Sequence, residues 1–429
     1  MLALLDQFYK YALESGHSES SYIVGGTVRD LVLGNEIKDA DIAFKGDALS
    51  ISRGFADTIS ASFVLLDEKF GIARIVLRGE YLDICTLYGD SIVDDLGNRD
   101  LTINAMAIPL SEFRSQDSLN RIIDPFGGLL DLEDKRVRMV SEKNLLSDPL
   151  RILRVFRFAA ALGFSIDDST SVAVQKHAEL IRNSAPERIS VELRRILGCS
   201  SSMPVFRIMK DSGLLTALFP GMSGYSDETW NKVWSSLEKT EGILRSPETC
   251  FPGKDSFLRQ YFASAYRVEC LKLTILLDDG AMAEQAAQRL KLSNKETEFI
   301  NTLSACNQTM LSVESAKRST IVGLLKKLGD DIYAVLIFGI ASGAKAPYQN
   351  HLIQLAREIA AIYHDEYLPR LRRLPFITGD DLIDKFGLSP SPFFKDILSS
   401  IELLALEGRI ATRDEALKAA GDMIKNKGI

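Results

Sequence analysis

Paired cysteines and long hydrophobic runs are both missing from this chain of 429 residues. No two of its cysteines form a CxxC pair; they are Cys85, Cys199, Cys250, Cys270 and Cys306. Scattered cysteines are typical of reduced thiols in the cytoplasm and argue against a zinc site. The longest apolar runs fall well short of the roughly 20 residues of a membrane-spanning helix, so we expect no contact with a membrane.

Histidine is scarce as well. The four histidines, His17, His177, His351 and His364, form no cluster in the sequence. His364 and Asp365 make an HD dipeptide, which metal-dependent phosphohydrolases combine with further spaced histidines and aspartates. Because those partners are missing, we reject a phosphohydrolase site.

The chain also lacks a positive net charge. It has 51 basic and 58 acidic residues, a formal net charge of −7, which argues against a protein that binds nucleic acid through bulk charge. Basic residues nevertheless gather locally. Residues 136–157 contain six basic and two acidic side chains, and Arg370–Arg373 reads RLRR. Such patches can follow nucleic-acid phosphates, although solvated surface is the alternative for any single arginine.

Two halves of different character follow one another along the chain. Residues 20–26, 61–67, 72–79 and 81–87 predict strands, and residues 27–34 and 47–60 predict helices. From about Leu145 onward the strand signal ends and helical periodicity continues to the C-terminus. The sequence therefore predicts an α+β fold, with a mixed sheet first and an all-helical remainder.

Two aspartates stand one residue apart in DADIAF (residues 39–44), a stretch that otherwise predicts a buried strand. Side chains at positions i and i+2 of a strand leave by the same face, so Asp39 and Asp41 would lie side by side. Their like charges would repel each other unless a cation lies between them. Mg²⁺ is usually held by one or two carboxylates together with substrate phosphates. The alternative is a solvated Asx-type turn, which is the commoner explanation of an isolated DxD.

A glycine pair precedes these acids in YIVGGTVRDLVLG (residues 22–34), between an apolar strand and a helix. Glycines let backbone N–H groups approach a phosphate closely, and a helix N-terminus adds partial positive charge. Gly25 and Gly26 are therefore a candidate phosphate cradle. Most glycine pairs only form tight turns, but the DxD that follows favours the phosphate interpretation.

Further polar candidates lie downstream. Asp83 in YLDICTL is a candidate third acid on a neighbouring strand, or a residue that simply faces solvent. In NRDLTINAMAI (residues 98–108), Arg99 can hold a phosphate in bidentate fashion, and Asp100 and Asn104 suit ribose hydroxyls. Asp100 could instead cap a helix, which would leave Asn104 without a role.

The segment SDPLRILRVFRFAAALGF (residues 147–164) predicts a helix with Pro149 in its first turn. Its arginines recur at three-residue spacing: Arg151, Arg154 and Arg157. Asp148 and Arg151 would be neighbours on one face, where a carboxylate beside a guanidinium matches the amino donor and ring acceptor that cytosine and adenine share. Uracil and guanine would bring a carbonyl against the carboxylate. The alternative is that Asp148 caps the helix and pairs with Arg151, for a few tenths of a kcal/mol.

Together these segments resemble the class II tRNA nucleotidyltransferases, the family of bacterial CCA-adding enzymes and poly(A) polymerases within the polymerase-β superfamily. GGTVRD with DAD resembles the family's first motif, and RDLTINA the second. DPFGGLLDLEDKRVRMV (residues 124–140) resembles the hinge-like third motif, DPLR the nucleotide-selecting fourth and RISVE (residues 188–192) the fifth. All five occur in the family's order, whereas the later helices resemble it only loosely.

The resemblance implies a domain order as well as an activity. A polymerase-β-like nucleotidyltransferase head would occupy residues 1–140, a helical neck 141–205, a helical body 206–335 and a tRNA-binding helical tail 336–429. The implied reaction adds C, A or both from CTP and ATP to the tRNA 3′ end without a nucleic-acid template.

The resemblance also implies roles for the candidate residues. Asp39 and Asp41, with Asp83 as a third acid, would serve two Mg²⁺ ions, one activating the tRNA 3′-hydroxyl and the other steadying pyrophosphate. Gly25, Gly26 and Arg29 would contact the triphosphate, and Arg99, Asp100 and Asn104 would contact the ribose. Asp148 and Arg151 would contact the base. Arg154 and Arg157 would hold the triphosphate or the primer backbone.

Two departures from the family pattern have consequences. Ser147 stands where the nucleotide-selecting motif usually has Glu, which would loosen how Asp148 is held. The connection between Asp83 and Arg99 is short, whereas full CCA-adding members carry a longer arginine-containing loop there that helps the switch from C to A. Members without that loop tend to stop after CC. We therefore expect a CC-adding enzyme with a separate A-adding partner enzyme.

Other interpretations stay open at this point. The same chemistry would serve a full CCA-adding enzyme, an A-adding enzyme or a bacterial poly(A) polymerase. The lack of a strongly basic C-terminal extension in this sequence argues against the poly(A) polymerase. From a different class, the chain could be an RNA-binding protein with a decayed active site. The intact DAD and RDLTINA segments argue against decay.

Overall fold

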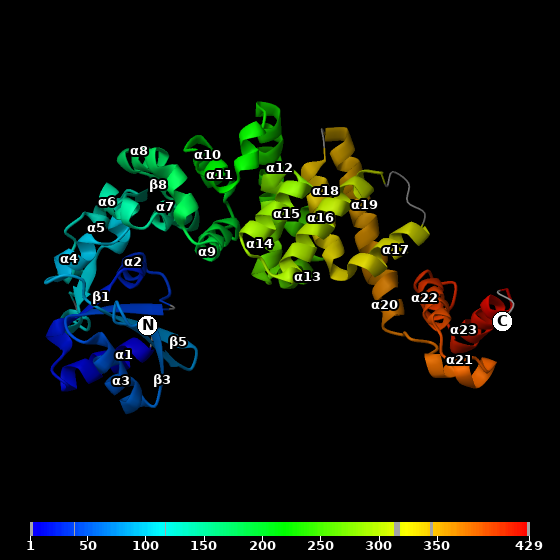
Figure 1. Ribbon diagram of the computed structural model, residues 1–429, viewed down its shortest axis with the longest axis horizontal. Coiled ribbons are helices and arrows are strands. Elements are labelled where there is room, and N and C mark those ends of the chain that lie inside the picture. The colour runs from blue at the N-terminus through cyan, green and yellow to red at the C-terminus, as the bar shows by residue number, and fades with distance from the viewer. Residues whose placement is uncertain (1–2, 38, 116, 313–317, 344–345, 427–429) are drawn as a thin grey trace. The chain divides into compact units, whose positions relative to one another are not determined.

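Helices and strands are distributed unevenly along the chain. The computed structural model describes residues 3–37, 39–115, 117–312, 318–343 and 346–426. The chain divides into two compact units, Met1–Ser223 and Gly224–Ile429, and every strand among the described residues belongs to the first (Figure 1). This distribution confirms the predicted α+β class. The predicted boundaries of head, neck, body and tail make a finer division and stay a prediction.

A mixed sheet forms the centre of the first unit. In the described residues its strands are β1 (Ser21–Val24), β2 (Asp39–Phe44), β3 (Ser62–Asp67), β4 (Ile72–Leu77), β5 (Glu80–Thr86) and β6 (Ala107–Pro109). They lie in the order β3-β4-β5-β2-β1-β6, with β2 parallel to β5 and the other neighbours antiparallel. Because β2 is paired on both sides, the direction in which each of its side chains points is firmly set.

Helices cover both faces of this sheet. Helices α1 (Ala3–Glu14) and α3 (Ala48–Ile59) meet through the rings of Phe8 and Phe55, whose centroids lie 5.1 Å apart. Both rings are fully buried, and burial of one such side chain stabilises a fold by roughly 1.5–3 kcal/mol. Helix α2 (Gly26–Val32) lies on the opposite face (Figure 1). The hydrophobic contacts of α1 and α3 leave the α2 face available for polar groups.

The strand β2 shows how sequence alternation separates these faces. Ala40, Ile42 and Phe44 are buried, as expected for positions that alternate along a strand. Asp39 and Asp41 leave by the other face, on which Asp39 is exposed and Asp41 half-buried. The predicted strand is therefore confirmed and the alternative of an Asx-type turn is wrong, because the paired acids lie on a central strand.

The remainder of the first unit is helical apart from one short strand pair. Its helices are α4 (Ile92–Gly97), α5 (Gly128–Glu133), α6 (Glu142–Ser147), α7 (Leu150–Leu162), α8 (Asp168–His177), α9 (Pro186–Leu197), α10 (Met203–Asp211) and α11 (Leu214–Leu218). Helices α7 and α9 pack against each other. Their apolar faces are buried, at residues such as Ile152, Phe156, Leu193 and Ile196. The polar faces of α7 and α9 therefore lie side by side.

The third motif connects the sheet to these helices through a buried polar network. Thr102 donates a hydrogen bond to Asp131 at 2.6 Å, and Arg138 donates to the same carboxylate at 2.9 Å. Gly128 lies so close to Thr102 that a Cβ atom there would be 2.3 Å from the carbonyl oxygen. Only glycine allows this approach, which explains the GG step in DPFGG.

The predicted elements of the head are confirmed, with some short additions. The strands predicted at 20–26, 61–67, 72–79 and 81–87 are β1, β3, β4 and β5, and the helices predicted at 27–34 and 47–60 are α2 and α3. The sequence does not predict β6 or the parallel pair β7 (Arg136–Val137) and β8 (Ser165–Ile166). Segments of two or three residues are too short to show a period.

The second unit consists of helices in its described part. They are α12 (Asp227–Arg245), α13 (Asp255–Phe262), α14 (Ala265–Leu277), α15 (Gly280–Arg289), α16 (Asn294–Ser312), α17 (Arg318–Leu328), α18 (Ile332–Ser342), α19 (Ala346–Ile362), α20 (Leu368–Leu371), α21 (Gly379–Phe386), α22 (Pro392–Leu406) and α23 (Arg413–Asn426). Helix α18 is buried from Ile332 to Ala341 and contacts α12, α14, α16 and α19. None of the helices in the described ranges has the length and apolar character needed to cross a bilayer.

Two sequence features of this unit have structural roles. In the RLRR cluster, Arg370 donates to the carbonyl oxygen of Leu406 at 2.9 Å and pairs with Glu366 at 3.1 Å. His364 lies in a π-helical turn, with its ring 4.9 Å from that of Phe257. Among the described residues no group of three or more His, Cys, Asp or Glu side chains is arranged to hold a metal ion, so His364 belongs to no such cluster.

Candidate active site

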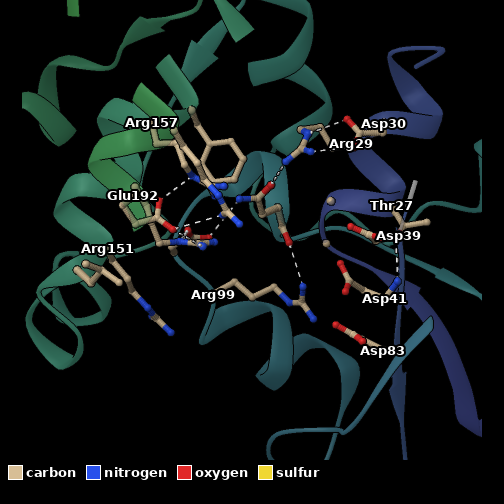
Figure 2. Close-up of a pocket in the computed structure, with 18 of the residues that line it drawn as sticks. Thr27, Arg29, Asp30, Asp39, Asp41, Asp83, Arg99, Arg151, Arg157 and Glu192 are labelled. Atoms are coloured by element: carbon tan, nitrogen blue, oxygen red, sulfur yellow. Dashed lines mark hydrogen bonds and ion pairs between the residues drawn. The ribbon is translucent and has the colours of Figure 1, made fainter. Parts of the chain in front are cut away.

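The residues nominated from the sequence meet at one cavity of about 980 Å³ in the first unit. All of them line its wall: Gly25, Gly26, Arg29, Asp39, Asp41, Asp83, Arg99, Asp100, Asn104, Asp148, Arg151, Arg154 and Arg157. Figure 2 shows the acids of the sheet on one side, Arg151, Arg157 and Glu192 on the other, and Arg99 between them. Segments more than 100 residues apart in the sequence therefore build a single site.

The acidic side of the cavity is formed by β2 and β5. Asp41 and Asp83 are register partners on these parallel strands, and Asp39 lies two residues before Asp41. Asp83 is engaged by Arg74 of β4 through two hydrogen bonds of 2.8 Å. In the described part of the chain, neither Asp39 nor Asp41 has an ion-pair partner of this kind. The cavity wall therefore carries two carboxylates that form no ion pair with any residue the structure describes.

Burial raises the pKa of Asp41 from its ordinary value of 3.8 to about 6. The negative charges of Asp83 and Asp39 add to this increase, whereas the Arg99 guanidinium opposes it. The backbone N–H of Asp41 donates to the Thr27 hydroxyl at 2.9 Å, which ties β2 to the start of α2. A carboxylate held where its charge is disfavoured is suited to bind a cation.

Gly25 faces this carboxylate from the neighbouring strand end. It has φ 68°, a conformation that favours glycine. A Cβ atom at this position would lie 2.6 Å from Arg99 Nη1 and 3.5 Å from Asp41 Oδ2. The absent side chain thus lets Arg99 approach the acids closely.

A chain of hydrogen bonds links α2 to the segment after α4 and on to α7. Arg29 donates to the Asn104 side-chain oxygen at 2.7 Å, and Asn104 donates to Asp100 at 3.3 Å. Asp100 accepts from Arg154 Nε at 2.6 Å. Burial of Asp100 opposes its ionisation, but the Arg154 charge and the hydrogen bonds from Arg154, Asn104 and the Leu101 N–H together outweigh burial and leave the pKa of Asp100 below its usual range. The short helical turn that follows has Leu101 at its N-cap and no side-chain cap, so the alternative of Asp100 as a helix cap is wrong.

A buried glutamate holds the arginines of α7. Glu192 of α9 pairs with Arg157 at 2.8 Å, Arg195 at 3.6 Å and Arg154 at 3.9 Å, and its side chain is only 6% exposed. Burial and the nearby Arg154 charge lower the pKa of Arg157 to about 10. The Arg157 guanidinium also lies 4.0 Å from the centre of the Phe158 ring. These contacts hold several positive charges in fixed positions at the cavity wall.

The Asp148 carboxylate has a partner that the sequence did not predict. It accepts two hydrogen bonds from Arg188, at 2.8 and 3.4 Å, rather than pairing with Arg151. Arg151 Nη1 donates to the Asn144 carbonyl oxygen at 3.4 Å. The alternative of an Asp148–Arg151 ion pair is therefore wrong. Both side chains still line the cavity.

The short connection between Asp83 and Arg99 is fastened by two adjacent acids. Residues 87–91 join β5 to α4. Asp94 Oδ2 accepts from the N–H groups of Asp90 and Ser91 at 3.2 and 2.9 Å. Asp95 accepts from the Tyr88 N–H at 3.1 Å and binds Arg99 through Nε at 3.1 Å and Nη2 at 2.9 Å. Asp95 thus couples this loop to the cavity.

Sequence reasoning missed several residues of this site. Asp95 could have been found from its i,i+4 spacing to Arg99. Arg188 and Glu192 lie in the fifth motif, but nothing in their spacing indicates which arginines or acids they meet. Arg74 and Arg195 carry no local signal at all.

Comparison with known proteins shows sequence similarity to polymerases and tRNA nucleotidyltransferases. A sequence model of the poly A polymerase head domain matches residues 21–92 and 86–138, and one described as a probable RNA and SrmB-binding site of polymerase A matches 163–225. The chain is 31% identical to the CC-adding tRNA nucleotidyltransferase of Geobacter sulfurreducens over 92% of this chain and 90% of that protein. It is 28% identical to the CC-adding tRNA nucleotidyltransferase of Synechocystis sp. over 94% of each.

Solved structures agree in fold. The Thermotoga maritima CCA-adding enzyme in complex with tRNA superposes with a TM-score of 0.70, at 24% identity, over 98% of this chain and 95% of that one. This likeness confirms the predicted head and helical remainder. On the identity to the Geobacter protein along nearly the whole length of both chains, this protein belongs to the class II tRNA nucleotidyltransferase family and is a nucleotidyltransferase.

Proposed function

We propose that this protein adds cytidine residues from CTP to the 3′ end of tRNA, without a nucleic-acid template, and stops after two. The observation that carries the proposal is a pair of carboxylates, Asp39 and Asp41, on one face of a central strand at the cavity wall, for which the described residues provide no ion-pair partner. Opposite them stand the arginines of α7. This arrangement suits a triphosphate whose reacting end meets the acids.

The acids fit divalent cations of the Mg²⁺ type. Burial, with a smaller contribution from Asp83 and Asp39, raises the pKa of Asp41 and so disfavours its ionised form, which a bound cation would stabilise. Two carboxylates are a typical protein contribution to Mg²⁺, since phosphates and water complete its six oxygen ligands. When bound, Mg²⁺ supplies charge to activate a hydroxyl and to stabilise a departing pyrophosphate. Asp83 of β5 lies beside these acids and adds negative charge, while its own carboxylate pairs with Arg74.

The remaining residues would bind and orient the nucleotide. Arg29, Arg154 and Arg157 are preorganised by acids or amides, so they offer fixed donors to phosphate oxygens. Asp100 and Asn104 are buried and bonded to those arginines, so their proposed contact with ribose is made from a rigid position. Asp148 and Arg151 would read the base edge. In-line attack by the tRNA hydroxyl then needs only correct placement and charge compensation.

The proposal that synthesis stops after CC is supported by the connection from β5 to α4. Only residues 87–91 lie outside the two elements, and this stretch contains no arginine. The hydrogen bonds to Asp94 and Asp95 hold both of its ends. A fastened loop of this length cannot act as the long flexible element expected of a full CCA-adding enzyme. The names of the Geobacter and Synechocystis relatives agree with this proposal. A separate enzyme would then add the terminal A.

Addition of labelled nucleotides to tRNA tests the proposal. The substrates are tRNA ending at the discriminator base, at C or at CC, with CTP and ATP offered singly and together in the presence of Mg²⁺. We expect two C additions to the first substrate, one to the second and none to the third. Completion to CCA would refute the CC proposal, repeated A addition would indicate a poly(A) polymerase, and no addition at all would refute the activity.

Variants connect the activity to the acids. Asp39→Ala and Asp41→Ala should abolish C addition while tRNA binding persists, because the acids act on the reacting groups. Asp57→Ala is the matched control, since Asp57 is an exposed acid of α3 in the same unit and does not line the cavity. Undiminished turnover in either cavity variant would refute the assignment of Mg²⁺ to these residues.

A further inference from the structure

We infer that Arg188 is a positioning residue that sets the orientation of the Asp148 carboxylate and thereby the choice of base. The inference rests on the proposed function, because it concerns how the proposed base-reading carboxylate is held. Arg188 lies in the first turns of α9, whereas Asp148 lies between α6 and α7. Their ion pair spans 40 residues of sequence.

The backbone does not hold Asp148 in either helix. Asp148 has φ −142° and ψ 97°, an extended conformation between the end of α6 and the start of α7. Its side chain ends in a torsion between sp³ and sp² carbons, which has broad energy wells. An acid in this position therefore needs contacts from its surroundings to keep one orientation.

The polar neighbours of Asp148 in the sequence do not hold its carboxylate. The Ser147 hydroxyl donates to the Asn144 carbonyl oxygen at 2.9 Å. Arg151 also turns to the Asn144 carbonyl oxygen, at 3.4 Å. The side-chain contacts of Ser147 and Arg151 thus go to Asn144, and the orientation of Asp148 falls to other groups.

Arg188 and one backbone group fix the carboxylate. Arg188 Nη2 donates to Oδ2 at 2.8 Å and Nη1 to Oδ1 at 3.4 Å, a two-point contact that defines the carboxylate plane. The Leu150 N–H donates to Oδ1 at 3.2 Å. A carboxylate has about four acceptor positions, so one on Oδ2 remains for a donor from the ligand. The amino group of cytosine or adenine can use that position, and the carbonyl of uracil or guanine cannot.

The exposure of the Arg188–Asp148 ion pair indicates that it contributes to the orientation of the carboxylate more than to the stability of the fold. The Arg188 side chain is 55% exposed and that of Asp148 30% exposed, so the contact adds little to stability. Arg195 offers a matched comparison. It lies on the same helix, lines the same cavity, is 56% exposed and pairs with an acid, Glu192, to which we assign no contact with the base.

Selectivity measurements with CTP and UTP test the inference. The experiment determines kcat/KM for each nucleotide on tRNA ending at the discriminator base, for the native protein, Arg188→Ala, Arg188→Lys and Arg195→Ala. We expect Arg188→Ala to lower the ratio of CTP to UTP by about tenfold or more, because an unfixed carboxylate no longer separates an amino group from a carbonyl. The CTP to UTP ratio of Arg188→Lys should lie between those of the native protein and Arg188→Ala, because a single ammonium group cannot define the carboxylate plane.

The control variant and the results that would contradict the inference give different patterns of kcat/KM. Arg195→Ala should lower kcat/KM for both nucleotides by the same factor and leave their ratio unchanged. An equal loss for both nucleotides in Arg188→Ala would overturn the inference and show that Arg188 contacts the triphosphate instead. Failure of the native protein to add CTP would refute the proposed function itself. The thermal midpoint of each variant, compared with that of the native protein, reports its folding independently.

Discussion

Replacing Asp41 with asparagine should stabilise the protein while abolishing its activity. Asp41 is half-buried beside two other acids, and its pKa rises from 3.8 to about 6. A raised pKa means that the fold disfavours the ionised carboxylate. Asparagine has nearly the same shape without the charge. The variant therefore removes from the metal-free protein the cost of burying a charge and the smaller repulsion by Asp83 and Asp39.

The magnitude follows from the pKa change. A difference of about two pKa units corresponds to about 3 kcal/mol at most, since one unit is about 1.4 kcal/mol. Water reaches a half-buried group and screens it, so we expect about 1–2 kcal/mol. For a unit of this size, that change raises the thermal midpoint by roughly 2–8 °C. The gain should be complete above pH 6, decline as the pH falls through 6, and vanish below about pH 4, where the carboxyl is neutral in both states.

Calorimetry of the metal-free protein between pH 4 and 8 measures this effect, and C addition to tRNA measures activity. Asp39→Asn is the control on the same strand face. Asp39 is exposed, so its variant should change stability by less than about 0.5 kcal/mol although it also loses activity. Mg²⁺ should narrow the stability difference between the native protein and Asp41→Asn, because a bound cation relieves the same repulsion. A variant that is no more stable than the native protein at pH 8 would refute the argument from charge.

Two further predictions concern buried charges. Glu192→Gln should destabilise the first unit by about 3 kcal/mol and reduce C addition, because it leaves Arg157 without its counter-charge while Arg154 keeps Asp100. Unchanged calorimetric stability would contradict this role. In the second unit, Lys272 and Glu241 form an ion pair of 2.8 Å with side chains 1% and 3% exposed. Lys272→Met should cost about 3–5 kcal/mol by leaving a buried carboxylate, and Lys272→Met with Glu241→Leu should recover most of that loss. A single-variant loss below about 1 kcal/mol in a calorimetric scan would argue against a charged pair.

Local patterns in the sequence predicted many of the residues that line the cavity, although not Arg74, Asp95, Arg188, Glu192 or Arg195. Strand alternation put Asp39 and Asp41 on one face of a strand, and helical spacing put Arg151 and Arg154 near one another. Both periods depend only on the backbone of a single element, so they can be read without knowledge of the fold. The motifs together then indicated the family and the α+β architecture.

The partner of each side chain was decided only by the tertiary structure. Asp83 faces Arg74, and Asp148 faces Arg188 rather than the neighbouring Arg151. These pairs depend on the register of β4 with β5 and on how α7 packs against α9. Such relations arise from the burial of many apolar side chains at once, and no short stretch of sequence contains them. The sequence by itself thus indicated most of the chemical groups that reach the cavity, and the packing of distant elements added the rest and determined which charges compensate each other there.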